Sequence, residues 1–244
     1  MRYTHTYRML LILLLIVVLL LLNLLLGSVS IPAQSIWNIL TGTGNEPVSW
    51  QNIVWKSRLP QALTALAAGA GLAVSGLQMQ TVFRNPLAGP SVLGISSGAS
   101  MGVAFVILLS GSLGGVALSR LGVMGEIALS VAAIIGSLSV MALIVYVSQK
   151  VKGNVTLLII GVMIGYVSNA VIGVLKFFSV EEDIRAYVIW GLGSFSRVSG
   201  NQMMLFVTLM AISLPLSFLL IKTLNLMLLG DGYARNLGLN IKRA

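Results

Sequence analysis

Apolar residues in this chain form long runs that short polar segments separate. The runs reach or exceed the roughly 20 residues that an α-helix needs to cross about 30 Å of hydrocarbon. A membrane β-barrel would instead show short segments of alternating polarity. The pattern therefore predicts an all-α, polytopic bundle of transmembrane helices, at residues 9–26, 59–83, 91–109, 123–148, 154–178 and 202–221.

The first run follows a basic start, MRYTHTYR, so a secretory signal peptide is an alternative. Its apolar core is longer than the roughly 7 to 15 residues of such peptides, and further apolar runs follow. We therefore expect a retained first helix. Basic residues are modestly more frequent on one side of the predicted spans, which predicts a cytoplasmic N-terminus.

The composition of the chain limits which metal sites, cofactors and partners can be expected. Of the 244 residues, 57% are hydrophobic and 9% are charged, with no cysteine and a single histidine, His5. Disulfides, zinc sites and iron–sulfur clusters are therefore not expected, and we predict neither a metal site nor a cofactor. The net charge of +9 is spread over loops, so it indicates membrane topology and no nucleic-acid partner.

Enzymatic motifs lack their context. The stretch GISSG, centred on Ser96, fits a nucleophile pattern that needs a histidine partner, and the one histidine is far away. No phosphate-binding loop of the GxxxxGK[ST] type is present. A secondary transporter would usually carry an acidic residue within a span, whereas Glu126 lies at a helix end. We therefore expect a non-enzymatic membrane protein that does not itself hold ATP.

Small residues recur at helical spacing within the predicted spans. Gly94, Gly98 and Gly102 are four residues apart in one helix, and Gly161 and Gly165 repeat the spacing in another. In lipid, where hydrophobicity does not drive helix association, such stripes allow backbones to approach closely. We expect these glycines to pack helices together.

Three ordered stretches resemble the iron-siderophore and cobalamin uptake permeases, the membrane subunits of type II ABC importers. They are RLPQALTALAAGAGLAVSGLQMQTVFRNPLAGPSVLGISSGAS (58–100), WGLGSFSRVS (190–199) and LNLMLLGDGYARNLGLNIKR (224–243). The resemblance implies the type II importer fold and a single permease domain over residues 1–244. Members have roughly ten transmembrane helices, so we expect this chain, with about six, to be truncated.

The resemblance also implies function and partners. It predicts an ATP-driven importer of a chelated iron compound, a siderophore, in the bacterial inner membrane. The alternatives are a cobalamin or haem importer, or a permease fragment that does not transport. The expected partners are a second permease subunit in a homodimer, cytoplasmic ATPase subunits, an extracytoplasmic binding protein and membrane lipid.

Individual residues match positions of functional segments in these permeases. Asn85 and Leu87 resemble a cytoplasmic gate, and Asn154 and Val155 resemble a second gating segment. Lys56 and Arg58 are candidate docking residues for the binding protein. The coupling segment, 224–243, would contact the ATPase through Gly230, Asp231, Ala234, Arg235, Leu237 and Gly238.

Overall fold

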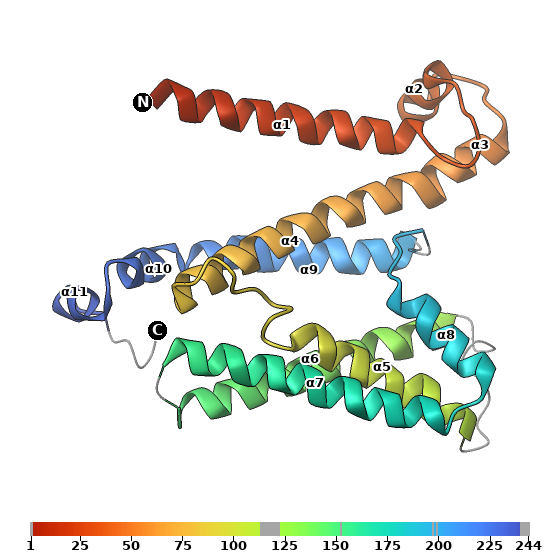
Figure 1. Cartoon of the computed structure of the whole chain (residues 1–244). Coiled ribbons are helices and arrows are strands. Elements are labelled where there is room, and N and C mark those ends of the chain that lie inside the picture. The colour runs from red at the N-terminus through yellow and green to blue at the C-terminus, as the bar shows by residue number, and fades with distance from the viewer. Residues whose placement is uncertain (1, 113–122, 152, 197, 199, 240–244) are drawn as a thin grey trace. The chain divides into compact units, whose positions relative to one another are not determined.

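The computed structural model describes residues 2–112, 123–151, 153–196, 198 and 200–239. All regular structure in that part of the chain is helical, which confirms the predicted all-α class (Figure 1). The helices are α1 (Arg2–Leu25), α2 (Ala33–Thr41), α3 (Val48–Ile53), the π-helix η1 (Val54–Arg58), α4 (Leu59–Phe83), α5 (Ile95–Ser112), α6 (Val123–Ser148), α7 (Asn154–Phe177), α8 (Glu181–Gly191), α9 (Gly200–Phe218), α10 (Ile221–Leu228) and α11 (Asp231–Asn236).

Several helices have the length and apolarity of membrane spans. Among the described residues four qualify: Thr6–Leu25, Val48–Phe83, Met124–Ser148 and Val155–Phe177. A fifth results if Gln202–Phe218 and Ile221–Leu228, which a short break separates, form one span. The apolar part of α5, Ile95–Leu109, is shorter. It begins at Ile95 and not at Ser91, because Gly94 adopts a left-handed φ of 75° and residues 91–94 form a turn.

The described chain divides into two compact units. One comprises residues 1–71 and 194–216, and the other comprises 72–193 and 217–244. In the first unit, α2, α3 and η1 form a small helical cap between α1 and α4. Its core is a cluster of buried apolar side chains: Ile31, Ile36, Ile39 and Val54. The Asn38 amide donates to the Glu46 carboxylate over 3.0 Å, which closes the loop between α2 and α3.

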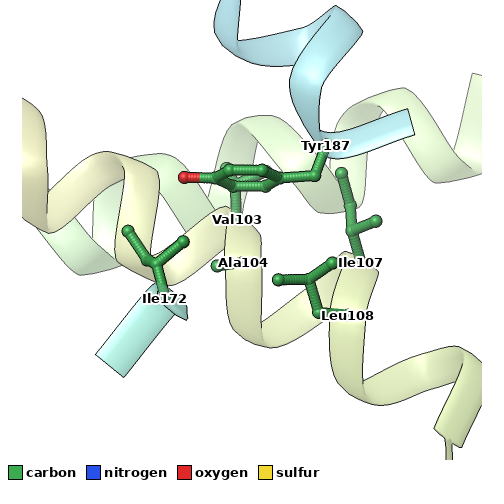
Figure 2. Close-up of a cluster of buried hydrophobic side chains, with 6 residues drawn as sticks. All are labelled: Val103, Ala104, Ile107, Leu108, Ile172 and Tyr187. Atoms are coloured by element: carbon green, nitrogen blue, oxygen red, sulfur yellow. The ribbon is translucent and has the colours of Figure 1, made fainter. Parts of the chain in front are cut away.

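The second unit is built around α5, which contacts α6, α7 and α8. Its core cluster contains the buried side chains Val103, Ala104, Ile107, Leu108, Ile172 and Tyr187. Figure 2 shows the Tyr187 ring lying across Val103, so that α8 is held against α5. The Lys176 ammonium lies 4.9 Å from the centre of the same ring, and a cation over an aromatic face adds to this contact.

Candidate functional site

The turn after α4, residues 84–94, contains the first predicted gate residues. The helix ends with two hydrogen bonds, from the Asn85 amide to the Gln80 carbonyl and from the Arg84 amide to the Thr81 carbonyl. This pair of bonds is the Schellman pattern of helix termination, in which glycine usually takes the left-handed position. Arg84 occupies that position here with φ 48°. A side chain there costs on the order of 1 kcal/mol.

Asn85 organises the chain directly after this helix end. Its side-chain oxygen accepts a hydrogen bond from the Leu87 amide over 2.9 Å, which is an Asx-turn. Its carbonyl accepts from the Ala88 amide over 3.1 Å. As a result Ala88 is buried and the Leu87 side chain is 80% exposed. Asn85 thus fixes the backbone conformation in which the Leu87 side chain is exposed.

The turn packs against the start of α7, where the second predicted gate segment lies. Ala88 and Leu93 form a buried cluster with Leu158 of α7. A Cβ added at Gly161 would lie 2.7 Å from the Leu93 Cα, so only glycine fits there. Val155, less than one turn before Leu158, is exposed. The Asn154 side chain lies outside the described part of the structure.

Glycines bring α5 and α6 into backbone contact. A Cβ at Gly98 would lie 2.7 Å from the Gly136 carbonyl oxygen, and one at Gly102 would overlap the Ala132 carbonyl. Gly165 of α7 is less tight, with a Cβ position 3.3 Å from the Ser97 hydroxyl. The Cβ positions of Gly94, Gly98, Gly102, Gly161 and Gly165 all lie within 3.5 Å of a neighbouring segment. Gly136 was not predicted as a packing residue, although small residues four positions apart, here Ala132 and Gly136, indicate a close helix contact.

The predicted coupling segment, 224–243, contains most of α10 and all of α11. Gly230 precedes α11 with φ 99°, and its carbonyl accepts a hydrogen bond from the Ala234 amide. Ala234 is fully buried, whereas Arg235 and Leu237 are exposed. The segment therefore presents a basic and an apolar side chain on a fixed turn. The Asp231 side chain and residues 240–243 lie outside the described part.

The end of α11 repeats the termination pattern of α4 with glycine in place of arginine. The Leu239 amide donates to the Ala234 carbonyl, and the Gly238 amide donates to the Arg235 carbonyl. Gly238 has φ 87°, a conformation that glycine adopts without steric cost. The two helix ends thus share one pattern of backbone hydrogen bonds and differ in the residue at the left-handed position.

A hydrogen bond joins the turn after α4 to the end of α10. The Arg84 guanidinium Nη2 donates to the Met227 carbonyl over 3.0 Å. The Met227 carbonyl, near the end of α10, also accepts from the Gly230 amide over 3.2 Å. The Arg84 side chain therefore connects the predicted gate to the predicted coupling segment, although the two are far apart in sequence.

Arg58 has a role within the chain. It is 4% exposed, and its guanidinium donates to the carbonyls of Leu24, Leu25 and Val29. Carbonyls at a helix C-terminus lack partners within the helix and carry partial negative charge, so a buried cation completes the end of α1. Of the two predicted docking residues, Lys56 is exposed while the Arg58 guanidinium is occupied.

Helix α8 carries a buried acid outside the apolar spans. Asp183 is 7% exposed, and its Oδ2 has no hydrogen-bond partner among the described residues. Burial, and secondarily the neighbouring Glu182 carboxylate, raise the pKa of Asp183 above its ordinary value. Burial also raises the pKa of Tyr187, and a hydrogen bond with Ser100 partly offsets this effect. No group of histidine, cysteine and acidic residues suited to a metal ion occurs in the described ranges.

Comparison with known proteins identifies the family. Residues 14–244 match the FecCD transport family. The chain is 35% identical to "Hemin transport system permease protein HmuU" of Yersinia pestis, over 90% of this chain and 62% of that protein. It is 34% identical to "Vitamin B12 import system permease protein BtuC" of Serratia proteamaculans, over 90% and 64% respectively. It is 38% identical to the "Probable iron chelatin transport system permease protein" of Helicobacter pylori, over 77% and 53%.

A solved structure described as "An inward-facing conformation of a putative metal-chelate type ABC transporter" is also similar. Its TM-score is 0.74 at 29% identity, over 94% of this chain and 67% of that one. The chain spans less than two thirds of the length of the curated relatives named above. The described part of the chain contains several apolar helices long enough to cross a membrane, and the chain belongs to the FecCD transport family.

Proposed function

We propose that this chain acts as a membrane-spanning permease subunit of an ATP-driven ABC importer for metal chelates, with a ferric siderophore as substrate. The observation that carries the proposal is the match to the FecCD transport family over residues 14–244. The arrangement of the turn, α7 and α10–α11 is consistent with it, because a transporter has to link its gate to the site where ATP energy enters.

The proposed substrate is a metal already enclosed by an organic ligand. The relatives are named for hemin, vitamin B12 and iron chelatin, and in each of these a chelator surrounds the metal. The chain has no cysteine and one histidine, so it offers few soft ligands to a bare transition metal. Haem and cobalamin remain the alternative cargoes, and a competition assay distinguishes them: excess haem or cobalamin should not reduce uptake of a labelled ferric siderophore.

We further propose that the importer contains two copies of the permease, two ATPase subunits and an extracytoplasmic binding protein. The N-terminus, the turn at 84–94 and α10–α11 would lie on the cytoplasmic side of the bacterial inner membrane. The hydrogen bond from Arg84 to Met227 supports a common side for the last two segments. Lys56, whose side chain is exposed, would meet the binding protein, and Arg58 would position that region from within.

The gate is proposed to close through the exposed side chains of Leu87 and Val155, with Asn85 fixing the turn and Asn154 beginning the second segment. A bulky, charged side chain at this constriction would disturb the apolar contact and obstruct the passage of a large cargo. In the transporter that contains this chain, Leu87→Arg should abolish uptake while Leu87→Met retains it. Normal uptake by Leu87→Arg would contradict the gate assignment.

Coupling is proposed to use α11 as a knob that inserts into a groove of the ATPase. Arg235 and Leu237 are its exposed contacts, and Gly230 and Gly238 shape its two ends. Because Ala234 is buried, a substitution there would also disturb folding, so the exposed position is the better probe. Arg235→Glu should lose co-purification with the ATPase subunit, and Arg235→Lys should keep it. Equal recovery of the ATPase with both variants would refute this contact.

A further inference from the structure

Arg84 stands where a helix end favours glycine. Both α4 and α11 end with the same pair of backbone hydrogen bonds. The left-handed position is filled by Gly238 at the end of α11 and by Arg84 at the end of α4. A non-glycine residue held in this conformation is strained, and such strain persists only where the surrounding structure compensates for it. A contact of the Arg84 side chain is therefore expected to compensate for the backbone strain.

The side chain reaches the end of α10. Its Nη2 donates to the Met227 carbonyl over 3.0 Å, where a cation matches the negative end of the helix. The same carbonyl accepts from the Gly230 amide, and Gly230 is the residue that begins α11. The Met227 carbonyl thus accepts hydrogen bonds both from the Arg84 side chain and from the residue that precedes α11.

The later part of the turn packs against α7. Ala88 and Leu93 are buried against Leu158 of α7, and the Gly94 Cβ position lies 2.7 Å from the Gly161 carbonyl oxygen. Movement of α10 and α11 would therefore act on a turn that is already anchored at its other end. A direct hydrogen bond between these two parts transmits such movement more directly than the chain itself, along which Arg84 and Met227 are 143 positions apart.

We propose that Arg84 is a positioning residue that links the gate turn to α10–α11, so that displacement of α11 moves Asn85 and Leu87. The proposal rests on the function proposed above, for the meaning of gate and coupling helix. Arginine suits this role because its planar guanidinium carries several donors in a fixed geometry and stays charged. A glycine at position 84 would relieve the backbone and break the link.

The link is testable in the chain itself, reconstituted in lipid nanodiscs. Because the chain has no cysteine, Leu87→Cys and Tyr233→Cys place spin labels only on the turn and on α11, both at exposed side chains. Double electron–electron resonance then measures the spread of distances between the labels. We expect one narrow distribution in the labelled parent, and a broader one after Arg84→Gly or Arg84→Gln.

Two controls separate the link from general folding. Lys222→Gln removes an exposed cation from α10 and should leave the distribution narrow. A second label pair, Phe105→Cys and Val174→Cys, reports on α5 and α7 and should stay unchanged in the Arg84 variants. An unchanged spread between turn and α11 in both Arg84 variants would overturn the proposal, and so would broadening of both label pairs in both variants.

This readout needs neither substrate nor ATPase, so the link and the proposed function fail independently. If the Arg84 variants broaden the distance distribution but the transporter shows no import, the proposed role of Arg84 holds and the proposed transport function is refuted. In the assembled transporter, Arg84→Gly should retain ATP hydrolysis but import less substrate per ATP. Equal loss of hydrolysis and import would contradict the coupling role.

Discussion

Replacing Gly98 by alanine tests how tightly α5 and α6 are packed. The added Cβ would lie 2.7 Å from the Gly136 carbonyl oxygen and 2.5 Å from a methyl group of Val140. The Val140 side chain can shift, but the Gly136 oxygen belongs to the backbone of a neighbouring helix. The methyl group therefore fits only if the two helices separate.

The magnitude follows from two opposing effects. Alanine is favoured over glycine within a helix by about 1 kcal/mol. Overpacking a well-filled contact costs typically 1–3 kcal/mol, and a clash with backbone belongs at the upper end of that range. The expected net change for Gly98→Ala is a loss of roughly 1–2 kcal/mol in the free energy of unfolding.

Gly173→Ala is the matched control. Gly173 lies in the same unit, on α7, and a Cβ there meets no atom within 4 Å. It should be neutral, or stabilising by up to about 1 kcal/mol. Equilibrium unfolding of the purified chain in mixed micelles, followed by circular dichroism, measures both variants. If Gly98→Ala is as stable as Gly173→Ala, the close contact between α5 and α6 is wrong.

Two further predictions concern charged side chains. The pKa of Asp183 is raised in the folded state, so its contribution to stability is present below its unfolded pKa and is lost as the pH rises through its folded pKa. Asp183→Asn should therefore flatten the fall in thermal stability above about pH 4. An unchanged pH profile would contradict the burial of Asp183. Arg58→Gln removes the guanidinium that donates to carbonyls at the end of α1, so it should lower the free energy of unfolding by roughly 3 kcal/mol. Lys56→Gln should have little effect, and equal effects of the two variants would contradict the role of Arg58 at the end of α1.

The long apolar runs predict most of the helical fold, because a span needs both length and continuous apolarity. The bounds of α4 agree with the predicted 59–83. The start of α5 does not agree, since residues 91–94 read as apolar enough for a helix while Gly94 takes a left-handed φ. Local hydropathy does not report backbone conformation, which Pro90 and Gly94 decide here.

The candidate site could be predicted only in part. Residue spacing indicated close packing at Gly98 and Gly161, because one helix face is a local property. Partners distant in sequence were not predictable: Arg58 read as an exposed rim charge, whereas the carbonyls it binds belong to the end of α1. The bond from Arg84 to Met227 was hidden for the same reason, since no local pattern marks a backbone acceptor.

Uptake into proteoliposomes decides whether this chain is a permease subunit of an ATP-driven importer. The transporter that contains the chain is reconstituted with its ATPase and binding protein, and a radiolabelled ferric siderophore is offered on the binding-protein side. We expect accumulation that requires ATP and is lost with Leu87→Arg. No accumulation, or accumulation that proceeds equally without ATP, would contradict it.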